Sequence, residues 1–456
     1  MSRYITLLIG ILVFSCDKDQ GPGYQEPYVP GEEDEPDLVE PLSDTEMMDL
    51  VQKETFKYFW DFANADSGAA KERYHPKDPT LNQDVVTSGG TGFGLMSIIV
   101  GIERGFITRV QGVERLDKIL AFLENADRFH GAWSHWIDGN DGRAIPFSEL
   151  DDGGDLVETA LLSQGLICVK EYFKNGSDVE KALAIKADVL WKGVEWNWYT
   201  QNEDVLYWHW SPSVGFEIGL KLTGYNEVQI AYVLAAASPN YSISKTVYEK
   251  GWANSGGIVS PASQYGIPLV LNHAGSSNLG GPLFFSQYSF LGLNPKNLSD
   301  QYANYWNVVV NHTKINRQYC MANPNNYLDY GADCWGLTAS YSRNTDGSLG
   351  YSAHSPSNDL GVVSPTAAIS SIAYTPAESL KVMHYLYQHK DRLLGPAGFY
   401  DAFSPHYNYW VADAYLAIDQ GPQIIMIENH RSGLLWNLFM QNTDVKKGLE
   451  QLGFNY

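Results

Sequence analysis

From Ser43 to the end of the chain, apolar residues recur at the three-to-four-residue spacing of helices, and strand-like alternation is scarce. It is confined to short pieces such as 144–147. The periodicity predicts eleven or twelve helices, joined by long loops rich in Gly, Pro, Trp and Asn. The first helix follows a capping box at Ser43–Glu46. The other expected segments are 90–104, 112–127, 154–173, 178–195, 212–222, 225–236, 298–316, 364–373, 376–390, 405–416 and 419–440.

This number of helices favours an all-α fold, an (α/α)6 barrel in which an inner ring of helices is surrounded by an outer ring. Hydrophobic residues at 44% are sufficient for such a core. In this architecture the loops at one end form a cleft, and several loops here are longer than ordinary connections, which indicates a binding role. A helical-repeat solenoid is the alternative, but the chain lacks the regular period that it requires.

The N-terminal part predicts export and anchoring. Residues 1–16 combine a basic start, an apolar run and Ser15-Cys16, which is typical of a bacterial lipoprotein signal that leaves a lipidated Cys16. An ordinary signal peptide with an incidental Cys is the alternative. Residues 17–42 are rich in Pro, Gly and acid and predict a flexible tether. Residues 43–456 are expected to form one catalytic domain, held at the cell envelope through the N-terminal lipid alone.

The net charge of −22 argues against polyanionic partners. Part of it lies in the tether, but the remainder is still acidic and contains no basic stripe of the kind that binds nucleic acid. A neutral substrate is therefore expected. Besides Cys16, the chain has Cys168, Cys320 and Cys334, whose spacing fits neither a zinc site nor a disulfide framework. Cys320 and Cys334 are close enough in sequence for a pair in an oxidising compartment.

The segment ELDDGGDLVE at 149–158 places five carboxylates around a Gly-Gly turn, just before an apolar helical run. Asp151, Asp155 and Glu158 are the candidates for function in it. Glycosidic bond cleavage needs such groups, because one carboxyl must keep a proton while another stays ionised. An acid-rich N-cap on a surface helix is the alternative interpretation.

Aromatic side chains lie just upstream, in HGAWSHWID at 130–138. Trp133 and Trp136 are candidates for platforms on which sugar rings stack, with Asp138 beside them. The histidines of this segment have no third ligand at a metal-binding spacing, so no metal site is predicted. The chain contains neither a G-x-S-x-G motif nor a phosphate-binding loop, so serine hydrolase and nucleotide chemistry are unsupported.

Four further acids combine with loop or cap positions. Glu227 is expected in the first turn of a helix, as a site residue or as a surface cap. Asp401, among aromatics in GFYDAFS, is either a ligand contact or a cap. Asp419 is a plausible N-cap, and Glu428 is within one turn of Arg431, with which it would form an ion pair.

Together these motifs resemble the bacterial glycoamylase-like family, whose characterised members are endo-β-1,2-glucanases of glycoside hydrolase family 144. The resemblance spans about residues 44–453 and is specific only as a combination. The motifs that carry it are DDGGDLVETA (151–160), TGYNE (223–227), WGLTAS (335–340), GFYDAF (398–403), and IDQGP (418–422) followed by IEN (427–429).

The resemblance implies an (α/α)6 barrel and cofactor-free, metal-free hydrolysis of β-1,2-glucan with inversion at the anomeric carbon. It implies Glu227 as the general acid, acting directly or through a substrate hydroxyl, and Asp151 and Asp155 as essential cleft acids. Asp401 and Asp419 are rival candidates for the base. The expected substrate contacts are Trp133, Trp136, Asp138, Glu158, Trp335, Tyr400 and Glu428.

Two segments after the Trp335 motif, 341–351 and 355–361, depart from the family pattern, which leaves chain-length preference and linkage open. The alternatives are a hydrolase of another glucoside linkage and a non-catalytic surface glycan-binding lipoprotein. A lyase is less favoured, because an acidic chain does not suit uronates. We expect a monomer that works with glycan-uptake components.

Overall fold

The computed structural model describes residues 42–456, so the predicted signal peptide with Cys16 and the tether up to residue 41 lie outside the described residues. Residues Ser43–Tyr456 pack as one compact unit. Its helices are α1 (Asp44–Trp60), α2 (Ser88–Glu103), α3 (Arg109–Asn125), α4 (Leu156–Phe173), α5 (Asp178–Lys192), α6 (Gln229–Ala237), α7 (Lys245–Val247), α8 (Tyr305–Ala322), α9 (Pro365–Ile369), α10 (Pro376–Gln388), α11 (Lys390–Leu393), α12 (Ala417–Arg431), α13 (Leu434–Gln441) and α14 (Thr443–Leu452).

The fold is the expected (α/α)6 barrel. The inner ring runs through α12, α2, α4 and α6, each in contact with the next. α9 and two short 3-10 segments, η4 (Leu283–Ser286) and η5 (Tyr288–Phe290), complete it. Between η4 and η5, the Gln287 side chain donates a hydrogen bond of 3.0 Å to the Ala367 carbonyl of α9, which joins the last two inner segments.

Inner helices are buried on almost all sides, and every residue of α6 is buried. α2 and α4 lie unusually close, because each presents a glycine to the other. A Cβ on Gly92 would come within 2.5 Å of the Leu161 carbonyl oxygen, and one on Gly165 within 2.3 Å of the Gly92 carbonyl oxygen. A side chain at either position would push the two helices apart, so these glycines fix the spacing of the inner ring.

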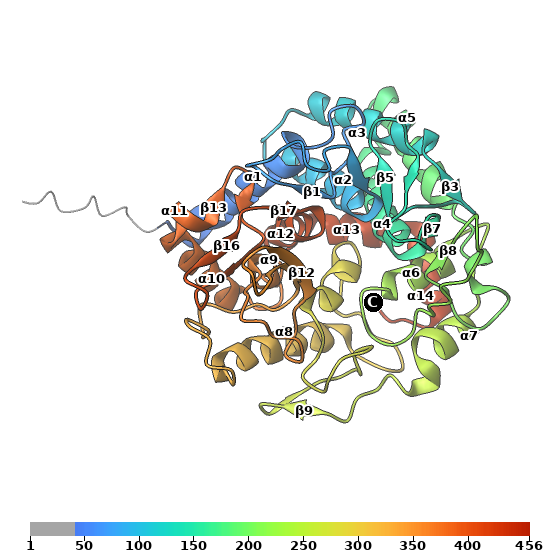
Figure 1. Cartoon of the computed structure of the whole chain (residues 1–456). Helices are drawn as coiled ribbons and strands as arrows, with labels where there is room; N and C mark the ends of the chain where they lie inside the picture. Colours follow the sequence, from blue (N-terminus) through green and yellow to red (C-terminus); the bar gives the residue numbers. More distant parts are fainter. Residues whose placement is uncertain (1–41) are drawn as a thin grey trace, which may run out of the picture. The chain divides into compact units, whose positions relative to one another are not determined.

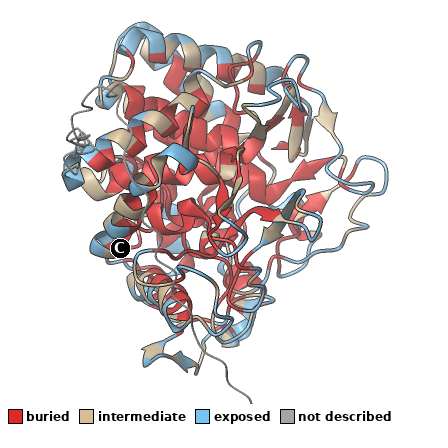
Figure 2. Ribbon diagram, turned by 60° about the vertical axis from the view of Figure 1, so that its left-hand side comes forward, coloured by how far each residue is buried: buried red, intermediate tan, exposed pale blue. Residues whose placement is uncertain are grey.

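The outer helices α1, α3, α5, α8 and α10 surround this ring in the view of Figure 1. Each buries only one face, as in Figure 2, where exposed and buried residues alternate along the peripheral helices. The predicted capping box of α1 is confirmed: the Ser43 hydroxyl accepts from the Glu46 N–H, and the Glu46 carboxylate accepts from the Ser43 N–H. α3 and α5 begin with the same motif.

The strands are short and lie in the loops. They are β1 (Arg73–Tyr74), β2 (Val85–Thr87), β3 (Arg128–Phe129), β4 (Ala132–Trp133), β5 (Trp136–Asp138), β6 (Ala144–Ile145), β7 (Gly154–Asp155), β8 (His209–Trp210), β9 (Ser263–Gln264), β10 (Ile267–Pro268), β11 (Ala339–Arg343), β12 (Leu349–Ala353), β13 (Leu394–Gly395), β14 (Gly398–Phe399), β15 (Ala402–Ser404), β16 (Trp410–Ala412) and β17 (Tyr415–Leu416). Three ribbons matter for the site: β2–β5–β6, β7–β8 and β11–β12, all antiparallel.

Two predicted helices are wrong. Residues 212–222 form turns, because Gly215 and Gly219 take left-handed φ values of 65° and 61° that end any helix after Pro212. The segment 405–416 carries left-handed residues and then enters β16 and β17.

The segment 419–440 is two helices, since Gly433, with φ 72°, separates α12 from α13. Within the described region, Cys168, Cys320 and Cys334 are buried free thiols, so Cys320 and Cys334 are not paired. None of the helices described here combines the length and apolarity needed to span a bilayer.

Candidate active site

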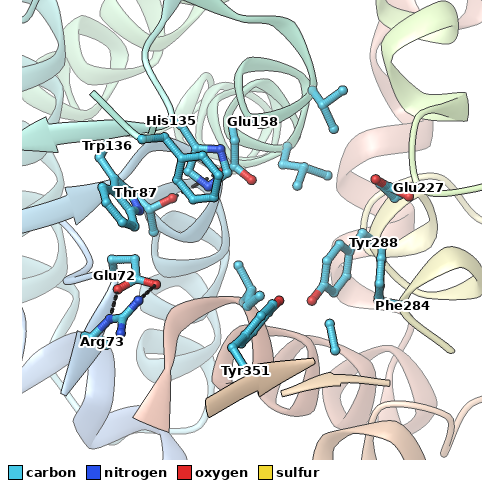
Figure 3. Close-up of a pocket in the computed structure, with 15 residues that line it drawn as sticks. Glu72, Arg73, Thr87, His135, Trp136, Glu158, Glu227, Phe284, Tyr288 and Tyr351 are labelled. Atoms are coloured by element: carbon cyan, nitrogen blue, oxygen red, sulfur yellow. Dashed lines mark hydrogen bonds and ion pairs between the residues drawn. The ribbon is translucent and has the colours of Figure 1, made fainter. Parts of the chain in front are cut away.

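A cavity of about 390 Å³ opens at the N-terminal ends of the inner helices (Figure 3). Thr87 precedes α2, Glu158 lies in the first turn of α4, Glu227 precedes α6 and Ile418 begins α12. Loops and ribbons from distant parts of the chain supply the remaining walls. The full lining is Glu72, Arg73, Thr87, His135, Trp136, Phe147, Val157, Glu158, Leu161, Glu227, Phe284, Tyr288, Ala339, Tyr351 and Ile418.

The acid cluster is both the N-cap of α4 and part of this site. Asp155 Oδ1 accepts hydrogen bonds of 2.9 Å from the N–H groups of Val157 and Glu158, which satisfies the first turn of the helix. Its second oxygen, Oδ2, lies 3.0 Å from His135 Nδ1. The two interpretations of this segment are therefore compatible, because one oxygen caps the helix and the other is directed to the cavity wall.

Asp151 lies deeper, where it pairs with His209 on the neighbouring strand. Asp151 Oδ1 is 2.9 Å from His209 Nε2, and both side chains are almost fully buried. Strand β7 pairs with β8 such that Asp155 lies opposite His209. Neither aspartate lines the cavity itself, so each acts on the site through its histidine or its helix.

Glu158 reaches the cavity from the first turn of α4. Its Oε2 accepts from the Thr87 hydroxyl at 2.9 Å and from the Gly89 N–H at 2.8 Å. A Cβ on Gly89 would stand 2.4 Å from this oxygen, so only glycine allows the contact. Burial raises the pKa of Glu158 and the charge of Asp155 adds to the rise, whereas the His135 imidazole opposes it.

Burial alone would favour neutral His135, but the charge of Glu158 and the hydrogen bond to Asp155 outweigh it and raise the imidazole pKa to about 9. His135 therefore carries both ring protons at neutral pH. Donor atoms of His135, Asp151 and Asp155 lie within 4.8 Å of one another, a spacing that a metal ion can bridge. A metal ion at this position would have to displace an imidazole proton, so its binding would weaken as the pH falls.

Glu227 lies two residues before α6 rather than in its first turn, and its carboxyl faces the same cavity as Glu158 (Figure 3). Burial is the main cause that raises its pKa to about 7, and the negative charges of Asp155 and Glu158 contribute. Its Oε2 is buried without a hydrogen-bond partner among the described residues. A carboxyl with these properties retains a transferable proton near neutral pH.

Aromatic side chains form two opposed walls (Figure 3). On one side, His135 stacks on Phe147 with 4.2 Å between ring centroids, and Trp136 meets Phe147 edge-on at 4.9 Å. On the other side, Phe284 stacks on Tyr288 at 5.1 Å. Tyr351, from the β11–β12 ribbon, completes the lower wall in this view.

Three polar atoms on these walls are buried and lack a protein partner: Trp136 Nε1, Tyr288 Oη and Glu227 Oε2. Buried polar groups are rarely left unpaired in native proteins. Their convergence on one cavity indicates a ligand that offers several hydroxyl groups, and the flat rings beside them suit the apolar faces of pyranoses.

Asp401 and Asp419 form a buried pair behind the cavity wall. Their carboxyl groups interact with one another, and Asp401 Oδ2 accepts from the Tyr341 N–H at 2.6 Å. Burial raises the pKa of Asp401 to about 6, and it raises that of Asp419 well above its usual range, with the charge of Asp401 adding to the effect. The charge of one carboxylate opposes the ionisation of the other, so the pair keeps a proton to a higher pH than a free aspartate does. Neither acts as a helix cap.

Two predicted platforms lie in the core. Trp133 has no exposed surface: its Nε1 donates to the Leu123 carbonyl at 3.0 Å, and the Arg128 guanidinium lies 3.9 Å from its ring centroid. Trp335 is likewise fully buried. The prediction of sugar contacts by these two residues is wrong, because both side chains are fully buried, whereas Trp136 on β5 lines the cavity.

Three more expected contacts lie away from the cavity lining. Asp138 holds the turn after β5 by accepting from the Asn140 N–H. Tyr400 stacks on Tyr415. Glu428 makes a two-bond ion pair with Arg104 at 2.6 and 2.7 Å, which replaces its expected pairing with Arg431 and corrects its assignment to the substrate site.

Several cavity residues carry no signal in the sequence. The Glu72–Arg73 ion pair comes from the loop at β1, and Phe147, Tyr288 and Tyr351 come from three other loops. None lies in a motif with recognisable spacing, and only the fold brings them together. Tyr351 belongs to one of the two segments that depart from the family pattern.

The sequence and the fold both match known proteins. The Glycoamylase family model, described as "Putative glucoamylase", matches residues 219–443. The crystal structure of an endo-β-1,2-glucanase from Chitinophaga pinensis, in complex with sophorotriose and glucose, is 52% identical, with a TM-score of 0.88 over 91% of this chain and 99% of that one. The chain belongs to the glycoamylase-like family. This confirms the resemblance that the motifs indicate.

Two further comparisons gave a sequence match and a fold match. An exo β-1,2-glucooligosaccharide sophorohydrolase from Parabacteroides distasonis is 44% identical over 435 residues, which are 90% of this chain and 58% of that protein. The chain thus spans little more than half of that curated relative. An endo-β-1,2-glucanase from Talaromyces funiculosus, in complex with β-1,2-glucan, has a TM-score of 0.60 at 11% identity, covering 90% of this chain and 92% of that one, which shows the shared fold alone.

Proposed function

We propose that the protein is an inverting glycoside hydrolase that cleaves β-1,2-linked glucan or its oligosaccharides without a metal ion. The observation that carries the proposal is Glu227: a buried carboxyl with a pKa of about 7, in a cavity between two aromatic walls. The relatives from Chitinophaga pinensis and Parabacteroides distasonis, whose substrates are β-1,2-linked glucans by name, supply the linkage.

In the proposed reaction, Glu227 gives its proton to the departing glycosidic oxygen, directly or through a substrate hydroxyl. A water molecule attacks the anomeric carbon from the opposite face and loses its proton to a carboxylate. Inversion requires about 6.5–9.5 Å between the two working carboxyl groups, which leaves room for this water. We propose Glu158 as the base, because among the predicted site acids it is the one that shares the cavity lining with Glu227.

The aspartates then have supporting roles. Asp155 caps α4 and keeps His135 protonated, and the cationic imidazole in turn helps Glu158 to stay ionised. Asp151 holds His209 behind the same ribbon. Asp401 and Asp419 remain the rival base candidates, with Asp401 the better placed of the two because its pKa is the lower.

Incubation with linear β-1,2-glucan, followed by sizing of the products, tests the activity and also separates endo from exo action. β-1,3- and β-1,4-glucans serve as linkage controls. Glu227→Gln should abolish product release, while Glu217→Gln, an exposed acid of the preceding loop, should leave it unchanged. Binding of glucan by the wild-type protein without any turnover would instead favour a glycan-binding lipoprotein.

The stereochemistry and the base have separate tests. Proton NMR of the first products distinguishes the α-anomer, expected from inversion of a β-linkage, from the β-anomer of retention. Turnover and glucan affinity are compared for Glu158→Gln, Asp401→Asn and Asp419→Asn. The variant that loses turnover and retains glucan affinity identifies the base. Full activity of Glu158→Gln would remove Glu158 from that role.

We also propose that the protein is a monomeric lipoprotein of the cell envelope, lipidated at Cys16 and associated with glycan uptake. The proposal is supported by residues 1–42, with their signal-like start and acidic tether. Detergent phase partition of the expressed full chain tests it. The wild type should enter the detergent phase and Cys16→Ser should not, and equal partition of both would contradict lipidation.

A further inference from the structure

A second hollow, of about 510 Å³, lies outside the candidate active site. It is lined by the segment that follows α5, including Glu195, Asn197, Trp198, Gln201 and Asn202, and by Phe216 from the loop after β8. We call it the Trp198 hollow. None of these residues lines the active-site cavity, and the proposed reaction makes no use of them.

Trp198 is the feature that sets this hollow apart. Its side chain is 42% exposed, more than that of any other tryptophan in the described part of the chain. One face of the indole is covered by His130, whose ring stacks on it at 3.8 Å between centroids with an interplanar angle of 13°. The exposed part of the residue borders the hollow, so the indole presents apolar surface to solvent there.

The His130 ring that supports this indole is itself held by two neighbouring side chains. The His130 ring meets Trp210 edge-on at 4.9 Å, and its Nδ1 lies 3.0 Å from the Glu195 carboxylate. A ring held in this way loses little conformational freedom when a ligand stacks on it. An exposed apolar ring without a function would gain nothing from such support.

Hydrogen-bonding groups surround the indole. Asn197 and Asn202 are exposed, and Gln201 is partly exposed. Gln201 and Asn202 both have left-handed backbone conformations, with φ values of 52° and 61°, which are uncommon outside glycine. An aromatic face ringed by amide and carboxylate groups matches the alternation of apolar faces and hydroxyl edges in a pyranose.

The hollow connects to the active site through one ribbon. Trp210, which packs against His130, lies on β8, and β8 pairs with β7 so that Trp210 is opposite Gly154 and His209 is opposite Asp155. The N-cap of α4 is thus one strand away from the aromatic group that supports Trp198.

We infer that the Trp198 hollow is a second carbohydrate site, which binds a glucosyl unit of a long β-1,2-glucan outside the catalytic cavity. The inference rests on the proposed function for its ligand. Its expected effect is confined to long chains, because a short oligosaccharide held in the cavity does not reach Trp198. Short substrates should therefore not detect its loss.

Binding is measured in the otherwise full-length Glu227→Gln protein, by affinity electrophoresis in gels that contain linear β-1,2-glucan. Trp198→Ala should weaken the affinity about three- to tenfold, the range expected for one lost stacking contact. Trp198→Phe should restore most of it. Tyr456→Ala removes an aromatic side chain with the same exposed fraction, 42%, at the C-terminus and should have no effect.

Hydrolysis by the protein with Glu227 intact gives the second readout. Trp198→Ala should lower kcat/KM on the polymer and leave it unchanged on a short β-1,2-oligosaccharide. Equal polymer affinity of Trp198→Ala and its parent would overturn the inference, and so would an equal loss on both substrates. Should Trp198→Ala fold poorly by circular dichroism, Asn197→Ala at the exposed rim replaces it with the same expectations. If the wild type cleaves no oligosaccharide, the proposed function fails instead.

Discussion

The burial of Glu227 predicts that Glu227→Gln, the substitution expected to abolish the proposed activity, also stabilises the protein. The pKa of this carboxyl is raised from 4.5 to about 7 in the folded state, mainly by burial. Below pH 4.5 the group is protonated in both the folded and the unfolded chain and has no effect. Between pH 4.5 and 7 only the unfolded chain releases the proton, so the free energy of unfolding falls as the pH rises.

Above pH 7 Glu227 is ionised in the folded chain as well, and the free energy of unfolding is lowered by the full cost of burying the charge. The rise of the pKa from 4.5 to about 7, at about 1.4 kcal/mol for each pH unit, corresponds to about 3.5 kcal/mol. Glutamine has the same shape and no charge. The atom at the buried Oε2 position lacks a hydrogen-bond partner with either glutamate or glutamine. The cost of this missing hydrogen bond is therefore the same in the wild type and in Glu227→Gln. Glu227→Gln should therefore be more stable than the wild type by about 3.5 kcal/mol at pH 8 and by almost nothing at pH 4.5.

Urea unfolding followed by tryptophan fluorescence, at pH 4.5, 6, 7 and 8, measures this difference. The control is Glu217→Gln, which removes an exposed carboxyl from the loop before α6 and should show no pH-dependent difference from the wild type. A Glu227→Gln protein with unchanged or lower stability at pH 8 would refute the reasoning. So would a gain of equal size at every pH, because it would show that the carboxyl does not titrate in this range.

Three further predictions concern activity. If Glu227 is the proton donor, kcat/KM on β-1,2-oligosaccharides should fall about fivefold between pH 7 and 8 as the carboxyl ionises, and a flat profile to pH 8.5 would contradict the assignment. Because His135 is protonated at neutral pH, prolonged dialysis against EDTA should leave kcat unchanged, whereas a loss that Ca²⁺ or Zn²⁺ restores would establish a metal at His135, Asp151 and Asp155. Gly89→Ala should displace Glu158 and lower kcat at least about tenfold with a small change in the thermal midpoint, and normal turnover would show that the 2.4 Å approach is readily relieved.

The parts of this molecule that are encoded locally were predictable. The capping box at Ser43 and the apolar inner helices follow from spacing and composition, and the acid cluster at 149–158 identified the cavity end of α4. The wrong predictions concern the direction of side chains. The core or the cavity receives Trp133 according to the strand that carries it, and the structure places Trp133 in the core and the nearby Trp136 at the cavity.

Long-range pairing was not predictable. Glu428 has Arg431 within one turn, but its partner is Arg104, more than three hundred residues earlier in the chain. Tyr288 and Tyr351 come from loops without a characteristic motif, and no local pattern places them opposite Trp136. The family resemblance predicted the barrel and its cleft, which these loop sequences could not, because a family describes the assembled fold rather than one segment.

The position of the cavity at the beginning of the inner helices has an electrostatic consequence. α2, α4, α6 and α12 all direct their N-terminal N–H groups, which carry partial positive charge, toward the same space. This field favours carboxylates there without any lysine in the lining, and the one arginine, Arg73, is neutralised by Glu72. The protonated imidazole of His135 is the other positive group in the lining. The barrel thus balances the acids of the cavity with diffuse backbone dipoles, one imidazolium and one paired guanidinium.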